Sequence, residues 1–268
     1  MNDFYPQRIV CLTEETTEIL YLLGEQDRIV GISGYTVRPP QARKEKPRVA
    51  AFSTAKIDKI LALEPDLVVG FSDLQADIAA DLIRAGVDVR IFNQRSVTEI
   101  LNIIVQLGAM VGAHARATAL AGELQAEINR LRALSDAETR HPFVYFEEWD
   151  EPIITGIRWV SELIEIAGGR DCFAELAHEP LATNRIVHDP SEVMRRAPDI
   201  IIGSWCGKRF SPQKVCARPG WDTIPAVCNG HLYEIKSANI LQPGPAALGD
   251  GLRALRECVE VWLQEQPQ

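Results

Sequence analysis

Short unbroken apolar runs alternate with helix-like patterns along almost the whole chain. Unbroken apolar runs are typical of strands that are covered on both faces, whereas apolar positions three or four residues apart are typical of helices. Strands that alternate with helices indicate βαβ units and parallel sheets, so the fold class predicted here is α/β. The strand-like segments are Arg8–Leu12, Arg28–Ile32, Leu67–Gly70, Val87–Phe92, Val144–Phe146, Ile200–Gly203 and His231–Ile235.

The chain repeats its own plan. Ile57–Gly70 and Pro190–Gly203 each have the pattern of a short helix, a Pro-Asp turn, a buried strand and a glycine. Proline ends the helix because it lacks an amide donor and restricts the residue before it, and we expect the glycine to let the chain turn out of the sheet. A second pair, Glu18–Gly24 and Glu162–Gly168, has the pattern of a helix closed by glycine. The repeat predicts two Rossmann-like lobes.

A single long helix is predicted between the two lobes. Residues Ala113–Leu134 contain no proline, are rich in good helix formers and place leucine and isoleucine on one face. Such a rod of about six turns would hold the lobes at a nearly fixed separation, with a ligand cleft between them. The domains we expect are an N-terminal lobe over residues 1–112, a bridging helix over 113–135 and a C-terminal lobe over 136–268.

Composition and charge narrow the function. The chain has 268 residues, of which 46% are hydrophobic, as in ordinary soluble globular proteins. It lacks the apolar run of about 18 residues that crosses a membrane, so we expect no membrane insertion. Its net charge of −9 disfavours nucleic acid and anionic membrane surfaces as partners. We further expect a monomer.

The start of the chain and the spacing of the cysteines indicate the cellular compartment in which the protein is expected. The first residues carry no basic and apolar leader, and the six cysteines show no CxxC spacing, which is typical of reduced thiols. The chain as written is expected in the cytoplasm. If a leader has been removed, the expected compartment is the periplasm.

Motifs of known catalytic chemistry are absent from the sequence. No glycine-rich phosphate loop, GxSxG elbow or HExxH helix occurs, so we predict a protein that is not an enzyme and has no cofactor. Cys206, His188, Glu147, Glu148 and Asp150 are of types that coordinate cobalt or iron, but without regular spacing they predict no metal site. The alternative that remains is an enzyme using a cluster of Glu147, Glu148, His188 and Cys206.

The order and spacing of several segments resemble one family. Arg8–Leu12 with Thr16-Thr17-Glu18, Val30–Tyr35 with Pro39-Pro40, and Ile57–Gly70 are similar to the helical-backbone (class III) periplasmic-type substrate-binding proteins of ATP-driven importers. The similarity is greatest to members that bind cobalamin, beside relatives that bind ferric siderophores and haem. It spans nearly the whole chain, and it implies a ligand held between the lobes.

The resemblance assigns aromatic residues in the first lobe. Tyr35, Phe52 and Phe71 fall where cobalamin-binding members have cleft aromatics. Each follows a predicted strand or lies in a loop between elements, where an aromatic ring can cover a flat macrocycle. We therefore predict that these three residues bind the ligand, with rim or core packing as the alternative for Phe52 and Phe71.

The second lobe departs from the family pattern. Arg185 stands where cobalamin-binding members have a cleft tryptophan, and Ala238 and Gln242 stand where they have an aspartate and an arginine. Two aromatic segments, Phe146–Pro152 and Ser204–Phe210, offer tryptophans that can stack and arginines that can bind carboxylates or phosphate. The residues predicted to bind the ligand here are Glu147, Trp149, Trp159, Arg185, Trp205, Cys206 and Arg209.

The resemblance also implies docking to a membrane permease through one acidic residue in each lobe. The matching positions are Asp58 and Ser191, with Glu192 displaced by one residue. One residue turns a helical side chain by about 100°, so only part of the docking pattern is kept. The predicted partner-docking residues are Asp58 and Glu192.

The function predicted from the sequence is binding of a corrinoid or a related metal chelate. The protein would act as the soluble, bilobal binding subunit of an ABC importer, or as a cytoplasmic relative of one. Ferric siderophore or haem binding is the first alternative, and the enzyme described above is the second.

Overall fold

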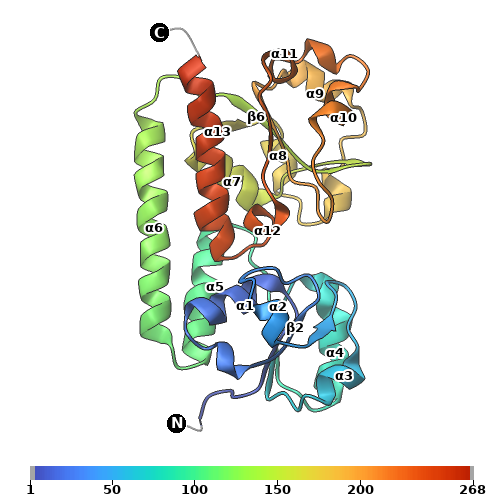
Figure 1. Ribbon diagram of the computed structural model, residues 1–268, viewed down its shortest axis with the longest axis vertical. Helices are drawn as coiled ribbons and strands as arrows, with labels where there is room; N and C mark the ends of the chain where they lie inside the picture. Colours follow the sequence, from blue (N-terminus) through green and yellow to red (C-terminus); the bar gives the residue numbers. More distant parts are fainter. Residues whose placement is uncertain (1–3, 266–268) are drawn as a thin grey trace. The chain divides into compact units, whose positions relative to one another are not determined.

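The structure is a computed structural model that describes residues 4–265. The chain forms two compact units, and each is described by itself. Unit 1 comprises Met1–Gln94, Thr98–Leu124 and Pro243–Pro245, and unit 2 comprises Arg95–Val97, Gln125–Gln242 and Ala246–Gln268. The long helix α6 (His114–Asp136; Figure 1) agrees with the predicted helix, and the division between the units falls within it.

Unit 1 is built on a five-stranded parallel sheet with the order β3-β2-β1-β4-β5. The order reverses between β1 and β4, and open α/β sheets bind their ligands at the carboxyl ends of strands at such a switch point. The strands are β1 (Ile9–Cys11), β2 (Ile29–Ser33), β3 (Arg48–Ala50), β4 (Leu67–Phe71) and β5 (Val89–Phe92).

Helices cover both faces of this sheet, which explains why its strands are apolar without alternation. Ile9 and Cys11 of β1 pack in a core with α1, α5 and the start of α6, whereas Val10 and Leu12 pack in a second core with α3 and α4. The helices of unit 1 are α1 (Glu14–Leu22), α2 (Ala42–Glu45), α3 (Ile57–Leu61), α4 (Ala76–Arg84) and α5 (Val97–Met110).

Unit 2 has its own five-stranded sheet. Four of its strands have the order β10-β9-β6-β7, and β8 also pairs with β6. Strand β7 is antiparallel to β6. Two separate α/β units with mainly parallel sheets confirm the predicted fold class. The strands are β6 (Phe143–Asp150), β7 (Ile153–Thr155), β8 (Arg170–Asp171), β9 (Ile200–Gly203) and β10 (Leu232–Glu234).

The helices of unit 2 also lie on both faces of their sheet. Helix α13 packs against α7 and contacts β9, while Tyr145 and Ile201 point into a core with Val193 of α9 and Trp221. The helices are α7 (Arg158–Ile166), α8 (Ala174–Ala177), α9 (Ser191–Arg196), α10 (Pro212–Cys216), α11 (Pro225–Asn229), α12 (Ser237–Ile240) and α13 (Leu252–Glu265).

The repeated Pro-Asp turn holds the neighbouring strand in each unit. The carboxylate of Asp66 accepts hydrogen bonds from the backbone amides of Gln7 and Arg8, just before β1. The carboxylate of Asp199 accepts one from the amide of Phe143, the first residue of β6. The aspartate thus fixes where the central strand enters each sheet.

The predicted role of the repeated glycine was wrong. Gly70 lies inside β4 and Gly203 ends β9, and neither has a positive φ, so neither turns the chain. Each is needed because another side chain approaches its backbone. A Cβ on Gly70 would lie 2.2 Å from Oε1 of Gln75, and one on Gly203 would lie 1.8 Å from the ring of Phe210.

Glycine does end the other repeated helix in the predicted way. Gly24 follows α1 with φ +69°, and Gly168 follows α7 with φ +100°. Residues with side chains rarely adopt this left-handed conformation, so the prediction of a glycine-closed helix is confirmed at both positions.

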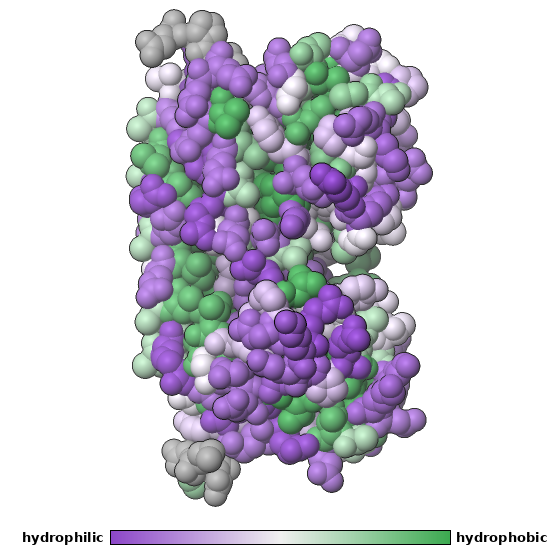
Figure 2. All heavy atoms as spheres, viewed as in Figure 1, coloured by the Kyte–Doolittle hydropathy of each residue, from purple (hydrophilic) through white to green (hydrophobic). Residues whose placement is uncertain are grey.

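Hydrophilic residues cover most of the face drawn in Figure 2, with smaller apolar areas between them. Within residues 4–265, none of the helices combines the length and the apolar character required to cross a membrane.

Candidate ligand-binding site

Two of the three predicted aromatics of unit 1 meet at the carboxyl end of β4. The ring centroids of Phe52 and Phe71 are 6.5 Å apart, and the ring planes are tilted by 44°. Phe71 is buried and Phe52 is half-buried. The pair therefore forms an apolar surface beside the switch point of the sheet.

A buried glutamine holds this pair in place. The side-chain oxygen of Gln75 accepts a hydrogen bond from the amide of Phe71 at 3.0 Å, and its nitrogen donates one to the carbonyl of Phe52 at 2.9 Å. The amide fits only because Gly70 has no side chain. Gln75 was not among the residues predicted from sequence, since a single glutamine in a loop carries no recognisable signal.

Tyr35 and Asp58 are displayed to solvent on unit 1. Tyr35 lies just after β2 with 59% of its surface exposed, and Asp58 is exposed on α3. Exposure of Tyr35 fits its predicted role in stacking on a ligand, and exposure of Asp58 fits its predicted role in docking to a partner. Both roles stay predictions.

Unit 1 also buries an acidic residue that the sequence reasoning missed. Glu15 lies in the first turn of α1, directly after the switch-point strand β1, and it is 1% exposed. Burial raises the pKa of its carboxyl from the usual 4.5 to about 8, although the Thr13 hydroxyl donates a hydrogen bond to it. Its Oε2 has no hydrogen-bond partner among the described residues. The raised pKa favours the protonated, uncharged form of this carboxyl at neutral pH.

A segment from far along the sequence covers this acid. A Cβ on Gly244 would lie 2.5 Å from Cβ of Glu15, and the Gln94 side-chain nitrogen donates to the carbonyl of Pro243 at 3.0 Å. Pro243–Pro245 belongs to unit 1. The only sequence signal was Thr13-Glu14-Glu15 at a helix start, where acidic residues are common.

In unit 2, Glu147 is the centre of a buried polar network. Both of its oxygens accept hydrogen bonds from Arg218, at 2.6 and 2.9 Å, and it also accepts bonds from the Tyr145 hydroxyl and the Trp205 indole. Glu147 is completely buried and Trp205 is 3% exposed. The structure thus gives both residues internal partners, and contact with a ligand would require those partners to move.

Lys208 covers the tryptophans that were predicted to stack on the ligand. Its ammonium nitrogen is 4.1 Å from the ring centroid of Trp149 and 5.0 Å from that of Trp205, and it forms an ion pair with Asp150. Cations bind the faces of aromatic rings in this way. Lys208 therefore competes with any ligand for the exposed part of Trp149.

Two further predicted residues are also engaged inside unit 2. Arg185 is 2% exposed, and its guanidinium binds the Glu148 carboxylate at 2.7 Å and the carbonyl of Thr155. Trp159 is 3% exposed and donates to the carbonyl of Ile240 at 2.9 Å. These contacts engage side chains that the sequence reasoning had offered to a ligand, although the buried Nε of Arg185 has no hydrogen-bond partner among the described residues.

The remaining predicted residues lie on the surface of unit 2. Cys206, Arg209 and His188 are exposed. Nε of Arg209 lies 4.0 Å from Oε2 of Glu234, which makes at most a weak ion pair. Glu192 on α9 is bound by Arg195 and Arg196, whose hydrogen bonds hold the pKa of its carboxyl below the usual range.

The groups considered for metal binding or catalysis are not gathered at one centre. Within residues 4–265, no three His, Cys, Asp or Glu side chains gather closely enough to hold a metal ion. Glu147 and Glu148, two members of the hypothetical catalytic cluster, are each held by an arginine.

Comparison with known proteins agrees with the fold and with the sequence resemblance. The chain is 27% identical over 246 residues to the vitamin B12-binding protein of Vibrio parahaemolyticus, covering 90% of this chain and 86% of that protein. The crystal structure of the periplasmic vitamin B12-binding protein of Vibrio cholerae superimposes with a TM-score of 0.78 at 24% identity, covering 97% of this chain and 99% of that one.

A haem-binding protein has a similar structure. The periplasmic haem-binding protein of Roseiflexus superimposes with a TM-score of 0.79 at 25% identity, covering 94% of this chain and 99% of that one. The periplasmic binding protein family matches residues 9–238. The match spans both sheets, the long helix and the aromatic pair, and the chain belongs to the periplasmic binding protein family.

Proposed function

We propose that this protein binds a corrinoid of the cobalamin type without transforming it, as the substrate-binding component of an ABC importer. The observation that carries the proposal is the similarity to a vitamin B12-binding protein over 90% of the chain. The aromatic pair at the carboxyl end of β4 supports it, because a large flat ligand gains most of its affinity from apolar contact with rings.

In unit 1, the contact surface would consist of Tyr35 and the Phe52–Phe71 pair. Tyr35 is the exposed member, and Gln75 fixes the backbone of the other two, so the rings are arranged before the ligand arrives. Arrangement in advance lowers the entropy cost of binding.

In unit 2, the surface would be made by Trp149, Cys206 and Arg209, which are the least buried of the predicted residues. Glu147, Trp159, Arg185 and Trp205 would support this surface from inside through the bonds described above. Lys208 would move when the ligand stacks on Trp149.

Docking to a permease is part of the proposal. Asp58 is exposed and available to a basic partner surface. Glu192 is already paired with Arg195 and Arg196, so its contribution would be weaker. An importer subunit is found outside the inner membrane, whereas a relative that kept only ligand binding remains in the cytoplasm. Cell fractionation separates these two cases.

Haem or a ferric siderophore is the second candidate, favoured by the structural similarity to the Roseiflexus haem-binding protein. Titration of the purified protein with cyanocobalamin, cobinamide, haemin and a ferric catecholate distinguishes the ligands. Tryptophan quenching and visible spectra would report each complex. We expect saturable, stoichiometric binding of the two corrinoids and no product. Binding of haemin alone would replace the corrinoid proposal, and turnover of any ligand would contradict a binding role.

A further inference from the structure

Positive charge is concentrated at one edge of the unit 1 sheet. Residues 43–59 carry six lysines and arginines and two acidic residues, whereas the whole chain has 28 cations and 37 anions. The six cations lie in or beside α2, the edge strand β3 and α3, and five of them are exposed. We call this group the basic edge, which consists of Arg43, Lys44, Lys46, Arg48, Lys56 and Lys59.

Backbone hydrogen bonds hold these elements together. Residues 46 and 47 alone separate α2 from β3, and the amide of Lys56 at the start of α3 donates to the carbonyl of Val49 in β3 at 3.2 Å. Ala50 and Ala55 form an antiparallel bridge beside this bond. In Figure 2, strongly hydrophilic side chains gather over the part of unit 1 where Figure 1 labels α2. The cations therefore belong to one continuous surface of unit 1.

The charges of the basic edge are not neutralised within the protein. Among residues 4–265, none of the six cations has an ion-pair partner. Of the two acidic residues in the same segment, Glu45 accepts a hydrogen bond from the Tyr21 hydroxyl at 2.7 Å, and Asp58 is exposed on α3. The surface therefore keeps a net positive charge.

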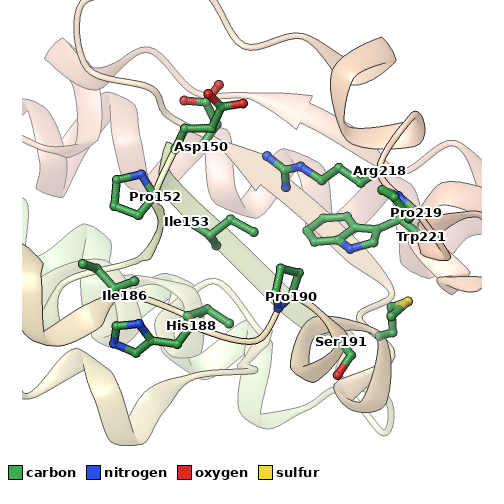
Figure 3. Close-up of a pocket in the computed structure, with 13 residues that line it drawn as sticks. Asp150, Pro152, Ile153, Ile186, His188, Pro190, Ser191, Arg218, Pro219 and Trp221 are labelled. Atoms are coloured by element: carbon green, nitrogen blue, oxygen red, sulfur yellow. The ribbon is translucent and has the colours of Figure 1, made fainter.

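The corresponding helix of unit 2 has its cations paired. Helix α9 begins at Ser191, which lines the pocket shown in Figure 3. It carries Arg195 and Arg196, which both bind the carboxylate of Glu192, and Arg196 also binds Glu175 at 2.6 Å. The repeated pattern therefore does not require free cations, and those of the basic edge need a separate explanation.

Protection of an edge strand does not explain them. Lysines often keep an open strand edge from pairing with another chain. The carbonyl of Ala50 accepts a hydrogen bond from Gly34, just after β2, and the preceding carbonyl, that of Val49, points the other way to Lys56. The outer edge of β3 is thus already bonded to this protein's own backbone, so it does not depend on charge for protection.

We propose that the basic edge binds the headgroups of anionic phospholipids at a membrane surface. The negative potential of such a surface attracts lysine and arginine, and the attraction falls off within a Debye length of about 8 Å at physiological ionic strength. The net charge of −9 disfavoured this partner at the level of the whole chain, but a membrane acts only on the charges within that distance. The choice of a membrane among anionic partners rests on the proposed function, because the permease of an importer lies in one.

The test is flotation of the purified full-length protein with vesicles of phosphatidylcholine alone or mixed with an equal amount of phosphatidylglycerol. We expect retention by the mixed vesicles only. Retention should be lost when the salt is raised from about 0.1 M to about 1 M, which shortens the Debye length from about 10 Å to about 3 Å. Equal retention by both kinds of vesicle, no retention, or retention that salt leaves unchanged would overturn the proposal. Binding of soluble polyglutamate but not of vesicles would assign the basic edge to an acidic protein and also overturn it.

Two triple variants with the same net charge locate the contact. The first neutralises three exposed cations of the basic edge through Lys44→Gln, Arg48→Gln and Lys56→Gln. The control neutralises three exposed cations of unit 2 through Arg132→Gln, Arg140→Gln and Lys214→Gln. We expect at least tenfold weaker vesicle binding in the first variant and less than a twofold change in the control, because only cations near the membrane contribute. Equal losses in the two variants would contradict the proposal.

Cyanocobalamin binding is measured on the same samples and should be unchanged in both variants. Vesicle binding by an unmodified protein that does not bind cyanocobalamin would support the basic edge and contradict the proposed function. Cyanocobalamin binding without vesicle binding would overturn the present inference alone.

Discussion

The two sheets end in the same sequence pattern but are completed by different chemistry. At Gly70 the space beside the backbone is filled by the amide of Gln75, which makes neutral hydrogen bonds to the backbone of Phe71 and Phe52. At Gly203 it is filled by the ring of Phe210, which packs against Trp205 above the Glu147–Arg218 pair. A repeated glycine therefore marks a close approach in both units, while the approaching group decides what kind of surface is built.

This difference suggests that the sheet end of unit 1 contacts the ligand, whereas the sheet end of unit 2 mainly supports the structure. Unit 1 ends in an aromatic pair with one half-buried ring, beside the exposed Tyr35. Unit 2 ends in charged groups that already bind one another, and Lys208 covers its accessible tryptophan. We therefore expect mutations at the end of the unit 2 sheet to change stability more than binding, and mutations of the aromatic pair to do the reverse.

The largest effect is expected for Glu147→Gln. It leaves the guanidinium of Arg218 without its counter-charge in a mostly buried position, which should cost about 3–5 kcal/mol in the free energy of unfolding. Gln75→Ala in unit 1 removes neutral hydrogen bonds and should cost about 1–3 kcal/mol. Urea unfolding of both variants measures the difference. An equal or smaller loss for Glu147→Gln would show that the two networks do not differ as described.

The buried acid of unit 1 should make stability depend on pH. The pKa of Glu15 is about 8 in the folded protein against an ordinary 4.5, so the folded chain keeps a proton that the unfolded chain loses. The resulting stability is complete below about pH 4.5 and is lost as the pH rises through about 8, by an amount on the order of 5 kcal/mol.

Glu15→Gln removes this titration. Thermal unfolding at pH 5 and pH 8 should show that the variant gains stability relative to the unmodified protein as the pH rises. Asp58→Asn, at an exposed site of the same unit, serves as the control and should show no such trend. Parallel curves for Glu15→Gln and the unmodified protein would mean that Glu15 is ionised in the fold.

The glycine pair should respond to a single methyl group. Gly203→Ala and Gly70→Ala each force a neighbouring side chain to move and should cost about 1–3 kcal/mol. Phe210→Leu should recover part of the loss in Gly203→Ala, because it removes ring atoms that lie as close as 1.8 Å to the new methyl. It should not rescue Gly70→Ala. Chemical denaturation of the single and double variants checks this, and rescue of both would contradict separate causes.

The smallest effect is expected at Lys208. Lys208→Met removes the ammonium from the face of Trp149 while keeping the length of the side chain, so cyanocobalamin should bind about two- to fivefold more tightly. Lys214→Met, at an exposed position of α10, should change nothing. Weaker binding in Lys208→Met would mean that the lysine contacts the ligand.

Sequence patterns predicted most of the strands and the fold class. Unbroken apolar runs revealed strands such as Leu67–Phe71 and Ile200–Gly203, because both faces of those strands are covered. The short strands β3, β7 and β8 were missed, since their two or three residues do not lie in apolar segments as long as the five-residue ones around β1 and β10.

The site was harder to predict than the fold. The family resemblance assigned Phe52 and Phe71 to the site, but their contact with each other was not predicted. Glu147, Arg185 and Trp159 have hydrogen-bond partners that lie 58, 30 and 81 residues away in sequence. Burial of Glu15 depends on Pro243–Pro245, which no local pattern connects to it. Such long-range contacts decide whether a polar side chain is available to a ligand.

Equilibrium dialysis against cyanocobalamin tests the central claim most directly, using the unmodified protein and the Phe52→Ala variant. The account predicts one molecule retained per chain and at least tenfold weaker retention by Phe52→Ala, with the unfolding midpoint nearly unchanged. No retention by the unmodified protein, or retention that the loss of the Phe52 ring leaves intact, would contradict it.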